Sequence, residues 1–207
     1  MTVVSDTFKT ITMAAVSTTE TRIAEIKEKS PEIIDVNPSD EPSFGEIPIA
    51  PKFTKAGHWE LITDGSGGKS KHTIKYVSNG TCDTRSQFVY MMVVDGAVAK
   101  IGGSKNTVKS RVQSYNCGVY SRWRGGSGKQ SVTNSVIYDS IEMCLLKGYT
   151  VELYVYFIDI PSITLNCWDT HTHVIDPTVY DVYETSAIRM FRELYGKNPI
   201  WSKNGHK

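Results

Sequence analysis

One β-hairpin constrains the fold of this chain more than any other feature of its sequence. Residues 88–94 and 97–102 are two runs of mainly β-branched and apolar side chains, a composition typical of strands. Asp95-Gly96 lies between them, and this dipeptide is a strong signal for a tight turn because both residue types tolerate a positive φ. The residues from 107 onward have helical spacing, so the sequence predicts strand, turn, strand and helix in close succession.

The register of this hairpin decides which side chains share a face. A two-residue turn would pair Tyr90 with Ile101 and would place Tyr90 and Lys100 on opposite faces. A three-residue turn of Val94, Asp95 and Gly96 would instead pair Tyr90 directly with Lys100. We favour the second register, because a purely structural hairpin has little reason to keep a phenol beside an ammonium on a half-buried face.

These residues resemble the motifs of the GIY-YIG nuclease superfamily. Tyr90 matches the first motif, Lys100-Ile101-Gly102 matches the second, and Arg111 lies on the helix that follows. Lys100 replaces the usual second tyrosine, and this lysine together with the run from Arg111 to Gly118 resembles the branch of small type II restriction endonucleases that carry the lysine. The resemblance extends from Gln87 to the C-terminus. It implies an α+β fold with a small mixed or antiparallel three-stranded central sheet flanked by helices.

A late glutamate adds to the resemblance. In a helix predicted over residues 181–195, Glu184 shares the spacing of Ile188, Phe191 and Tyr195, so it lies on the apolar stripe. Burying a carboxylate is costly unless it is paired or bound to a metal. The resemblance implies that Glu184 is the metal ligand. The segment that follows is similar to the family's C-terminal asparagine motif, with either Asn198 or Asn204 as the matching residue.

The resemblance implies a role for each of four residues. Tyr90 would activate the attacking water, Arg111 would hold the scissile phosphate, and Glu184 would bind one Mg²⁺ or Mn²⁺ per active site. A phenol alone is a poor base at neutral pH because its reference pKa is about 10. Lys100 would lower the pKa of Tyr90, because a neighbouring ammonium favours the phenolate.

The chain departs from this branch at Gly103, where the restriction enzymes have a histidine after their Lys-Ile-Gly. If a histidine relays a proton or orders the water in this chain, it would have to come from elsewhere in the sequence, and His58 and His72 are the candidates.

Charge is concentrated around the hairpin although the net charge of the chain is only +1. Residues 96–138 contain seven Lys or Arg and no Asp or Glu. Such a stretch can neutralise phosphates, so we expect double-stranded DNA as the partner; the alternative is a solvated basic face. The residues expected to contact DNA are Lys69, Lys71, Lys105, Lys109, Arg122, Trp123, Arg124 and Lys129. Trp123 has a second interpretation, as a core residue.

The remaining segments suggest three parts. Residues 1–51 form an accessory arm, with a helix over 18–29 and then five prolines, that either wraps a partner subunit or is a partly disordered acidic leader. Residues 52–86 form an accessory β-hairpin, and residues 87–207 form the nuclease domain. Within that domain we expect a helix over 107–115, with Val108, Val112 and Tyr115 on its buried face, a helix over 131–147 and a strand over 150–160. Residues 161–181 are expected to be irregular.

Several other site classes are disfavoured. The four cysteines are widely spaced, no apolar segment could span a bilayer and no signal peptide is evident, so we expect a cytoplasmic protein with reduced thiols. A zinc site in the 167–173 cluster lacks a distal ligand pair. The triplet at Gly68 lacks the first glycine of a phosphate loop.

Three functions fit these residues. The preferred one is a site-specific type II restriction endonuclease that depends on a divalent metal and acts as a homodimer. A phage or mobile-element nuclease with relaxed specificity would use the same residues. The third is a catalytically inactive DNA-binding module.

Overall fold

A computed structural model describes residues 18–30, 32–62, 71–77, 79–122, 132–167 and 171–202, with the side chains of 79, 117–122 and 132 outside the description. Residues 18–29 are helical. Three short 3₁₀ turns follow: η1 (Pro38–Asp40), η2 (Phe44–Glu46) and η3 (Ala50–Lys52). The remaining elements are β1 (Thr54–Leu61), β2 (His72–Tyr76), α2 (Asn79–Asp83), β3 (Gln87–Val94), β4 (Ala97–Ser104), α3 (Val108–Arg122), α4 (Val132–Leu146), β5 (Val151–Ile158), β6 (Ile163–Cys167), β7 (His171–Ile175) and α5 (Tyr180–Tyr195).

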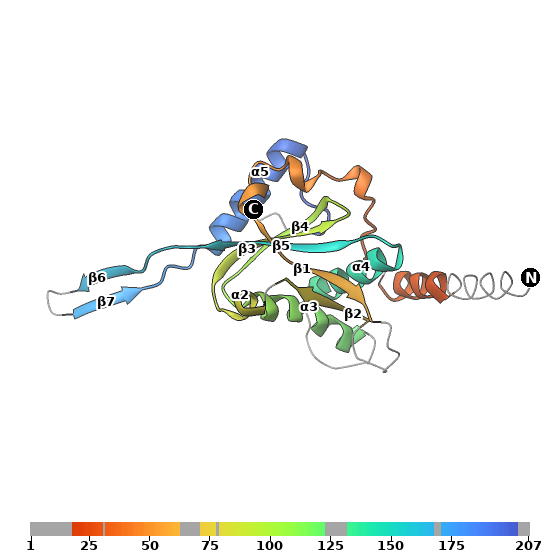
Figure 1. Cartoon of the computed structure of the whole chain (residues 1–207), viewed down its shortest axis with the longest axis horizontal. Coiled ribbons are helices and arrows are strands. Elements are labelled where there is room, and N and C mark those ends of the chain that lie inside the picture. The colour runs from red at the N-terminus through yellow and green to blue at the C-terminus, as the bar shows by residue number, and fades with distance from the viewer. Residues whose placement is uncertain are drawn as a thin grey trace, which may run out of the picture.

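The centre of the molecule is a five-stranded sheet in the order β2-β1-β5-β3-β4, in which every neighbouring pair is antiparallel (Figure 1). The α+β class is as predicted, but the sheet has five strands rather than three. The difference arises because β1 pairs with β5, from Thr54 opposite Val155 to His58 opposite Glu152, so the expected accessory hairpin extends the central sheet.

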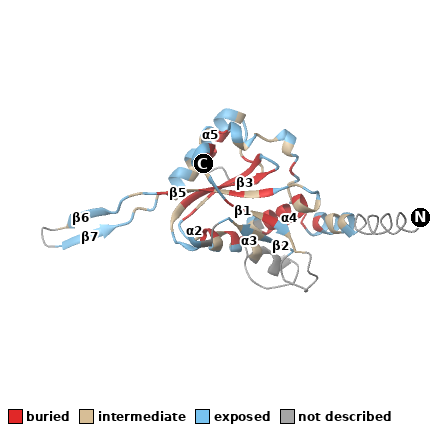
Figure 2. Cartoon of the chain, in the orientation of Figure 1, coloured by how far each residue is buried: buried red, intermediate tan, exposed pale blue. Residues whose placement is uncertain are grey.

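Helices cover both faces of this sheet and bury two apolar cores. On one face, α3 and α4 pack against alternate strand residues such as Phe88 and Met92. On the other, α5 packs Ile188 and Phe191 against residues of the opposite parity, among them Met91. Successive side chains of β3 point to opposite faces of the sheet, and both faces are covered by helices. The strand is therefore apolar on both faces and buried almost throughout (Figure 2).

The turn of the β3–β4 hairpin differs from the predicted one. Asp95 and Gly96 have φ values of 44° and 84°, which is a two-residue turn of the type that such a dipeptide favours. A β-bulge then shifts the register between Met92 and Val93, so that Met92 lies opposite Lys100 and Tyr90 opposite Gly102. Tyr90 and Lys100 are therefore diagonal neighbours instead of a direct pair. They still share a face, because the bulge adds one residue and reverses the alternation.

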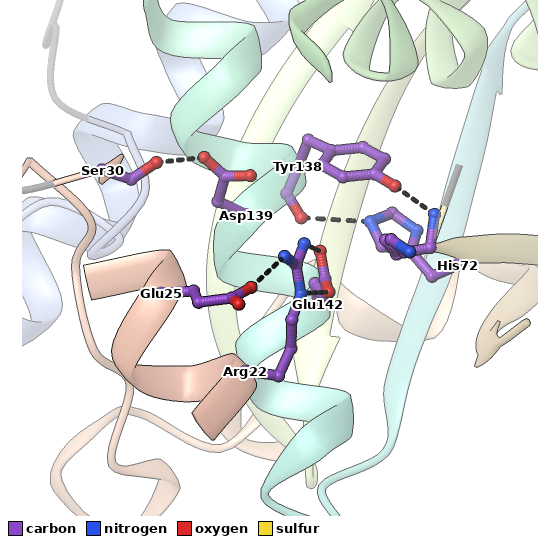
Figure 3. Close-up of polar contacts among 8 residues, drawn as sticks. Arg22, Glu25, Ser30, His72, Tyr138, Asp139 and Glu142 are labelled. Carbon is purple, nitrogen blue, oxygen red and sulfur yellow. Dashed lines mark hydrogen bonds and ion pairs between the residues drawn. The ribbon is translucent and has the colours of Figure 1, made fainter. Parts of the chain in front are cut away.

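The first part of the accessory arm folds back on its own chain. In the helix of residues 18–29, Ile26 is fully buried, and Arg22 lies between Glu25 and the buried Glu142 of α4 (Figure 3). Arg22 Nε donates to Glu142 Oε1 at 2.7 Å, and Ser30 donates to the buried Asp139. Residues 18–30 thus form part of the body. Residues 1–17 also belong to the segment predicted as either a disordered leader or a partner-wrapping arm, and they lie outside the described residues.

The predictions for the later elements are mostly confirmed. Helices α3, α4 and α5 and strand β5 match the expected ranges, although α3 continues to Arg122. The prediction of an irregular stretch over 161–181 is wrong: residues 163–167 and 171–175 form a separate two-stranded hairpin, β6–β7, that projects from the body (Figure 1). Among the residues that the structure describes, no helix is long and apolar enough to cross a membrane.

Candidate active site

The candidate site is built around the buried phenol of Tyr90. Its side chain points from β3 toward α3 and is 1% exposed. The ring lies directly over Gly102 of the neighbouring strand, and a Cβ atom at position 102 would overlap the phenol group. A glycine is therefore required at this position for the tyrosine to lie flat against β4.

Arg111 and Tyr115, one turn apart on α3, both contact this phenol. Arg111 donates from Nε and Nη2 to Tyr90 Oη at 3.2 and 3.0 Å, and the two phenol oxygens of Tyr90 and Tyr115 are 2.5 Å apart. The guanidinium also lies over the Tyr115 ring, 4.9 Å from its centroid. Tyr115 was expected only as a core residue of this helix. Its spacing of four residues from Arg111 was the available signal for a place in the site.

Lys100 lies on the same face but has a different contact. Its ammonium donates to the Trp201 carbonyl at 3.3 Å, and the side chain is buried. Trp201 is held beside β4 because its backbone N–H donates to the Ala99 carbonyl at 2.8 Å. The cation in contact with the Tyr90 phenol is therefore Arg111, whereas Lys100 was expected to fill this position.

Glu184 reaches the site from α5, on the opposite face of the sheet. A Cβ atom at position 103 would lie 2.9 Å from Glu184 Oε2 and 2.8 Å from the Tyr180 ring, so this carboxylate lies against the bare backbone of Gly103. Because neither glycine has a side chain, the backbone of β4 is approached closely from both faces. Tyr90 lies against Gly102 on one face, and Glu184 lies against Gly103 on the other. The negative charge of Glu184 favours the protonated forms of Tyr90, Lys100 and Arg111, and so contributes in the direction of a higher pKa for each of them.

Gln87, the first residue of β3, fixes the start of the helix that carries Glu184. Its Oε1 accepts from the backbone N–H of Val179 at 2.7 Å and of Tyr180 at 3.1 Å, and its Nε2 donates to the Pro177 carbonyl at 2.6 Å. The Val179 side chain cannot cap the helix, so Gln87 satisfies these otherwise orphaned donors. Nothing in the sequence pointed to this function, because Gln87 is distant from α5 along the chain.

Burial dominates the protonation of these groups. It raises the pKa of Tyr90, and the neighbouring Arg111 opposes this only in part. It also raises the pKa of Tyr115. For Lys100, burial and the repulsion of Arg111 lower the pKa to about 8. The expectation that Lys100 brings the pKa of Tyr90 below its usual value is not met in this structure.

The donor set can be tested for a metal. Within the described residues, no group of three or more His, Cys, Asp or Glu side chains could hold an ion. Glu184 is a single half-buried carboxylate at the edge of the site. Magnesium is commonly held by one or two carboxylates together with substrate phosphate oxygens and water, so Glu184 alone fits a magnesium ion that arrives with a phosphodiester.

The histidines proposed to replace the missing relay lie elsewhere. His72 is 1% exposed and stacks on Tyr138, with ring centroids 4.1 Å apart, and burial lowers its pKa to about 4. His58 pairs with Glu60 at 3.0 Å on β1. His72 is on β2, the edge strand farthest from β4, and β1 is the strand next to β2. The space beside Gly103 is occupied by Glu184 and Tyr180 instead.

The residues expected to contact DNA are only partly described. Lys71 and Lys105 are exposed, and Lys109 pairs with Asp83 at 2.6 Å. Lys109 also lines a pocket of about 240 Å³ between β2 and α3. Lys69, Trp123, Arg124 and Lys129 lie outside the described residues, as do the side chain of Arg122 and the motif candidate Asn204. The other candidate, Asn198, is half-buried.

The fold has a counterpart among solved structures. No protein-family model and no curated protein matches the chain. The restriction endonuclease HPY188I, solved in complex with product DNA, superposes with a TM-score of 0.54 at 22% identity, over 83% of this chain and 93% of that one. EndoII of bacteriophage T4 gives a TM-score of 0.48 at 20% identity, over 77% and 98%. The first similarity shows that this chain shares the fold of a nuclease.

Proposed function

We propose that the chain is a divalent-metal-dependent endonuclease that hydrolyses phosphodiester bonds in double-stranded DNA, of the GIY-YIG type. The observation that carries the proposal is the convergence of Tyr90, Arg111 and Glu184 at the glycine pair of β4, with Lys100 on the same face. Arg111 and Lys100 are two cations on the face of Tyr90 that would stabilise an anion there, and the Glu184 carboxylate lies on the other face of β4. The nuclease fold of the structural counterpart supports the same conclusion.

In this proposal Arg111 changes partner when the substrate binds. A phenol oxygen has one hydrogen to donate and two acceptor positions. When Tyr90 donates to Tyr115, the two N–H groups of Arg111 fill both acceptor positions, so no lone pair is left for a water. A phosphate is the stronger acceptor for a guanidinium and binds it through two parallel hydrogen bonds. Transfer of Arg111 to the phosphate would free an acceptor position on the Tyr90 oxygen for the attacking water. Tyr90 would take the proton of this water as a phenolate, after its own proton has passed to bulk water.

Lys100 has a supporting role in this scheme. Its pKa of about 8 leaves it mainly protonated at neutral pH. Once Arg111 has moved to the phosphate, Lys100 would still be a cation on the face of Tyr90, and its charge would then favour the phenolate. Tyr115 would hold the Tyr90 oxygen in place throughout.

Glu184 would hold one Mg²⁺ or Mn²⁺ per site. When bound, this ion would supply charge compensation at the phosphate and the leaving oxygen. The chain's own contribution is to fix the carboxylate: Gln87 anchors the start of α5, and the absence of a side chain at Gly103 lets the carboxylate reach the edge of β4.

Site specificity is a finer proposal. A type II restriction endonuclease is our preferred form of the function, since Lys100 and the run from Arg111 to Gly118 resemble that branch. A phage or mobile-element nuclease with relaxed specificity is the second candidate, because it would use the same site. The two differ in the product: a restriction enzyme cuts a plasmid into discrete fragments, whereas a relaxed nuclease gives a smear.

The test is cleavage of a supercoiled plasmid by the full chain with and without Mg²⁺. Wild type is expected to cut only with the metal. Glu184→Gln should lose cleavage while it retains DNA binding in a gel-shift assay. Glu193→Gln is the matched control, because it removes an exposed carboxylate from the same helix and should cut like wild type. Cleavage by Glu184→Gln at the wild-type rate would refute the assigned site, and absence of cleavage by wild type would favour the inactive DNA-binding module.

A further inference from the structure

The last described residues of the chain pair with the outer edge of β4. β4 is an edge strand of the central sheet, and Lys100 lies in its middle. Trp201 donates its backbone N–H to the Ala99 carbonyl at 2.8 Å. Ser202 Oγ accepts from the Ile101 N–H and donates to the Ile101 carbonyl, each at 3.2 Å. This two-residue C-terminal segment therefore bonds to the strand residues directly before and after the lysine.

Ser202 uses its side chain where a neighbouring strand would use its backbone. An edge strand carries backbone N–H and C=O groups that no strand beside it satisfies. A hydroxyl has one hydrogen to donate and two acceptor positions, so one serine can satisfy both backbone groups of Ile101. Ser202 is 6% exposed, which leaves little access for water to take over these two hydrogen bonds. Loss of the hydroxyl would therefore leave both groups of Ile101 without this partner at a buried position.

Trp201 provides the acceptor for the buried ammonium of Lys100. Its carbonyl accepts from Lys100 Nζ at 3.3 Å. Its indole ring is 1% exposed and lies in the apolar core that also contains Tyr90 and Tyr115. The indole N–H donates to the Ile34 carbonyl at 3.4 Å. Because the core holds the side chain of Trp201, the position of its carbonyl relative to β4 depends on the bonds that join the C-terminal segment to the strand.

The other segment on this edge lies farther from the site. The Phe44 N–H donates to the Gly96 carbonyl at 2.7 Å, and the Val98 N–H donates to the Pro42 carbonyl at 2.9 Å. Both of these bonds lie at the hairpin end of β4. The C-terminal segment is therefore the one that holds the edge around the lysine.

Lys100 depends on such a contact because of its length and its charge. The ammonium is carried on a flexible four-carbon chain, and the charge of Arg111 repels it. The side chain is nevertheless buried, on the same face as Tyr90. A carbonyl acceptor offsets part of the cost of burying this charge. The hydrogen bond to Trp201 thus fixes where the cation lies.

We propose that Ser202 is a positioning residue for Lys100. Its hydroxyl joins the C-terminal segment to β4, which keeps the Trp201 carbonyl against the ammonium and the ammonium on the face of Tyr90. The inference rests on the proposed function, in which the charge of Lys100 favours the Tyr90 phenolate. Ser202 acts through the lysine and not on the reacting groups.

The test is the pKa of Lys100 in the full chain, measured by NMR titration of protein that contains isotope-labelled lysine. Lys100→Met assigns the signal, and wild type is expected to titrate at about 8. In Ser202→Ala we expect this pKa to change by at least about 0.5, because the ammonium would either lose its acceptor or move into water. Ser202→Cys keeps the volume but offers only a weak donor and acceptor, so it should change the pKa in the same direction.

Two controls separate positioning from a general effect of removing a buried hydroxyl. Ser140→Ala removes the hydroxyl of a fully buried serine on α4 and should leave the pKa of Lys100 unchanged. Ser202→Thr keeps the hydroxyl and should restore the wild-type value more closely than Ser202→Ala does. Either Ser202→Ala or Ser202→Cys, once shown to be folded by circular dichroism, decides the outcome. Wild-type titration of Lys100 in that variant would overturn the proposal, and so would an equal change in Ser140→Ala.

Plasmid cleavage separates this inference from the proposed function. If both hold, Ser202→Ala should lower kcat about three- to ten-fold with little change in KM, and the pH at which kcat falls should move with the pKa of Lys100. If wild type cleaves nothing but the pKa of Lys100 depends on Ser202, the positioning stands and the nuclease function fails. If wild type cleaves with Mg²⁺ but Ser202→Ala titrates and cuts like wild type, the nuclease function stands and Ser202 has no part in it.

Discussion

Arg111 and Tyr90 are joined by two hydrogen bonds from one guanidinium to one phenol oxygen, at 3.2 and 3.0 Å. The phenol stays neutral because burial raises its pKa and Arg111 opposes that rise only in part, and the two hydrogen bonds occupy its oxygen. This pair of hydrogen bonds also orients the guanidinium, whose pKa is raised despite burial by the two phenols of Tyr90 and Tyr115 and, to a smaller extent, by Glu184. In the free site Arg111 and the two phenols are therefore hydrogen-bonded to one another, and a phosphate that binds Arg111 would have to replace the bonds from Arg111 to Tyr90.

The first prediction concerns Tyr115, which we assign as a positioning residue. Tyr115→Phe removes the hydroxyl 2.5 Å from Tyr90, so the Tyr90 hydroxyl loses its fixed direction. We expect kcat for plasmid cleavage to fall by about ten-fold while KM changes little, because the free energy of one hydrogen bond corresponds to a rate factor of this size. Tyr90→Phe should abolish cleavage in the same fold, as checked by circular dichroism. The pH at which cleavage reaches half its maximum should shift in Tyr115→Phe, which a merely structural loss would not produce.

The control for this prediction is Tyr195→Phe, because Tyr195 packs against Phe191 at the end of α5. It should leave both the rate and the pH profile unchanged. A Tyr115→Phe enzyme with wild-type kcat and pH profile would show that the contact between the two phenols has no part in cleavage.

The second prediction concerns the bare backbone at Gly103. A Cβ there would lie 2.9 Å from Glu184 Oε2 and 2.8 Å from the Tyr180 ring, so Gly103→Ala must displace at least one of them. We expect cleavage to fall by about ten- to one-hundred-fold, since a carboxylate shifted by an ångström fits its ligand poorly. Added Mg²⁺ should restore part of the rate, because the defect lies at the proposed metal ligand.

Gly80→Ala is the matched control for Gly103→Ala, because a Cβ at position 80 meets no atom within 4 Å. It should cut like wild type at every Mg²⁺ concentration. Equal rates for wild type and Gly103→Ala would mean that Glu184 does not need its place beside Gly103.

The sequence predicted the parts of the fold that depend on local pattern. The stripe of Val108, Val112 and Tyr115 is buried as its spacing indicated, and so are Ile188 and Phe191 of α5. The position of the Asp95-Gly96 turn was recognised because its positive φ values require such residues, but the turn has two residues instead of the favoured three. These features follow from periodicity and turn chemistry, which neighbouring residues alone determine.

The sequence could not predict features that depend on contacts between distant segments. The bulge opposite Met92 decides that Tyr90 and Lys100 share a face, yet no residue type marks it. The contact of Gln87 with the start of α5 joins residues far apart in the chain. The β6–β7 hairpin is a different case: Ile163, Leu165 and Cys167 alternate as in a strand, so its signal was present in the sequence.

The third prediction concerns the stability cost of burying Lys100. Its pKa of about 8 in the fold lies below the 10.5 of an unburied lysine, so between these pH values the unfolded chain binds more protons and stability rises with pH. Lys100→Met should therefore be more stable than wild type at pH 7, by up to about 3 kcal/mol. The advantage should shrink as the pH is raised from 8 to 10.5.

Urea denaturation of both proteins at pH 7 and pH 9.5 measures this difference. Lys105→Met is the control, because Lys105 is exposed and its replacement should change stability little at either pH. A Lys100→Met protein less stable than wild type at pH 7 would show that the Trp201 contact outweighs the cost of burial.

The fourth prediction concerns the ion pair that ties the N-terminal helix to α4. Glu142 is 2% exposed, and Arg22 donates to it at 2.7 and 3.1 Å (Figure 3). Arg22→Met would leave this carboxylate buried without its cation, which we expect to cost about 3–5 kcal/mol in the free energy of unfolding at pH 7. Burial already raises the pKa of Glu142, and loss of Arg22 would raise it further. The cost should therefore shrink as the pH falls and the carboxylate becomes protonated.

Two further variants decide whether this pair acts as the structure indicates. Arg22→Met/Glu142→Met should recover most of the lost stability, because replacing both partners of a buried pair with apolar side chains is close to neutral. Lys147→Met breaks the more exposed pair with Asp35 and should cost no more than about 1 kcal/mol. Urea denaturation at pH 7 and pH 5 measures all three. If Arg22→Met cost no more than Lys147→Met, the helix of residues 18–29 would not be held to the body by Glu142.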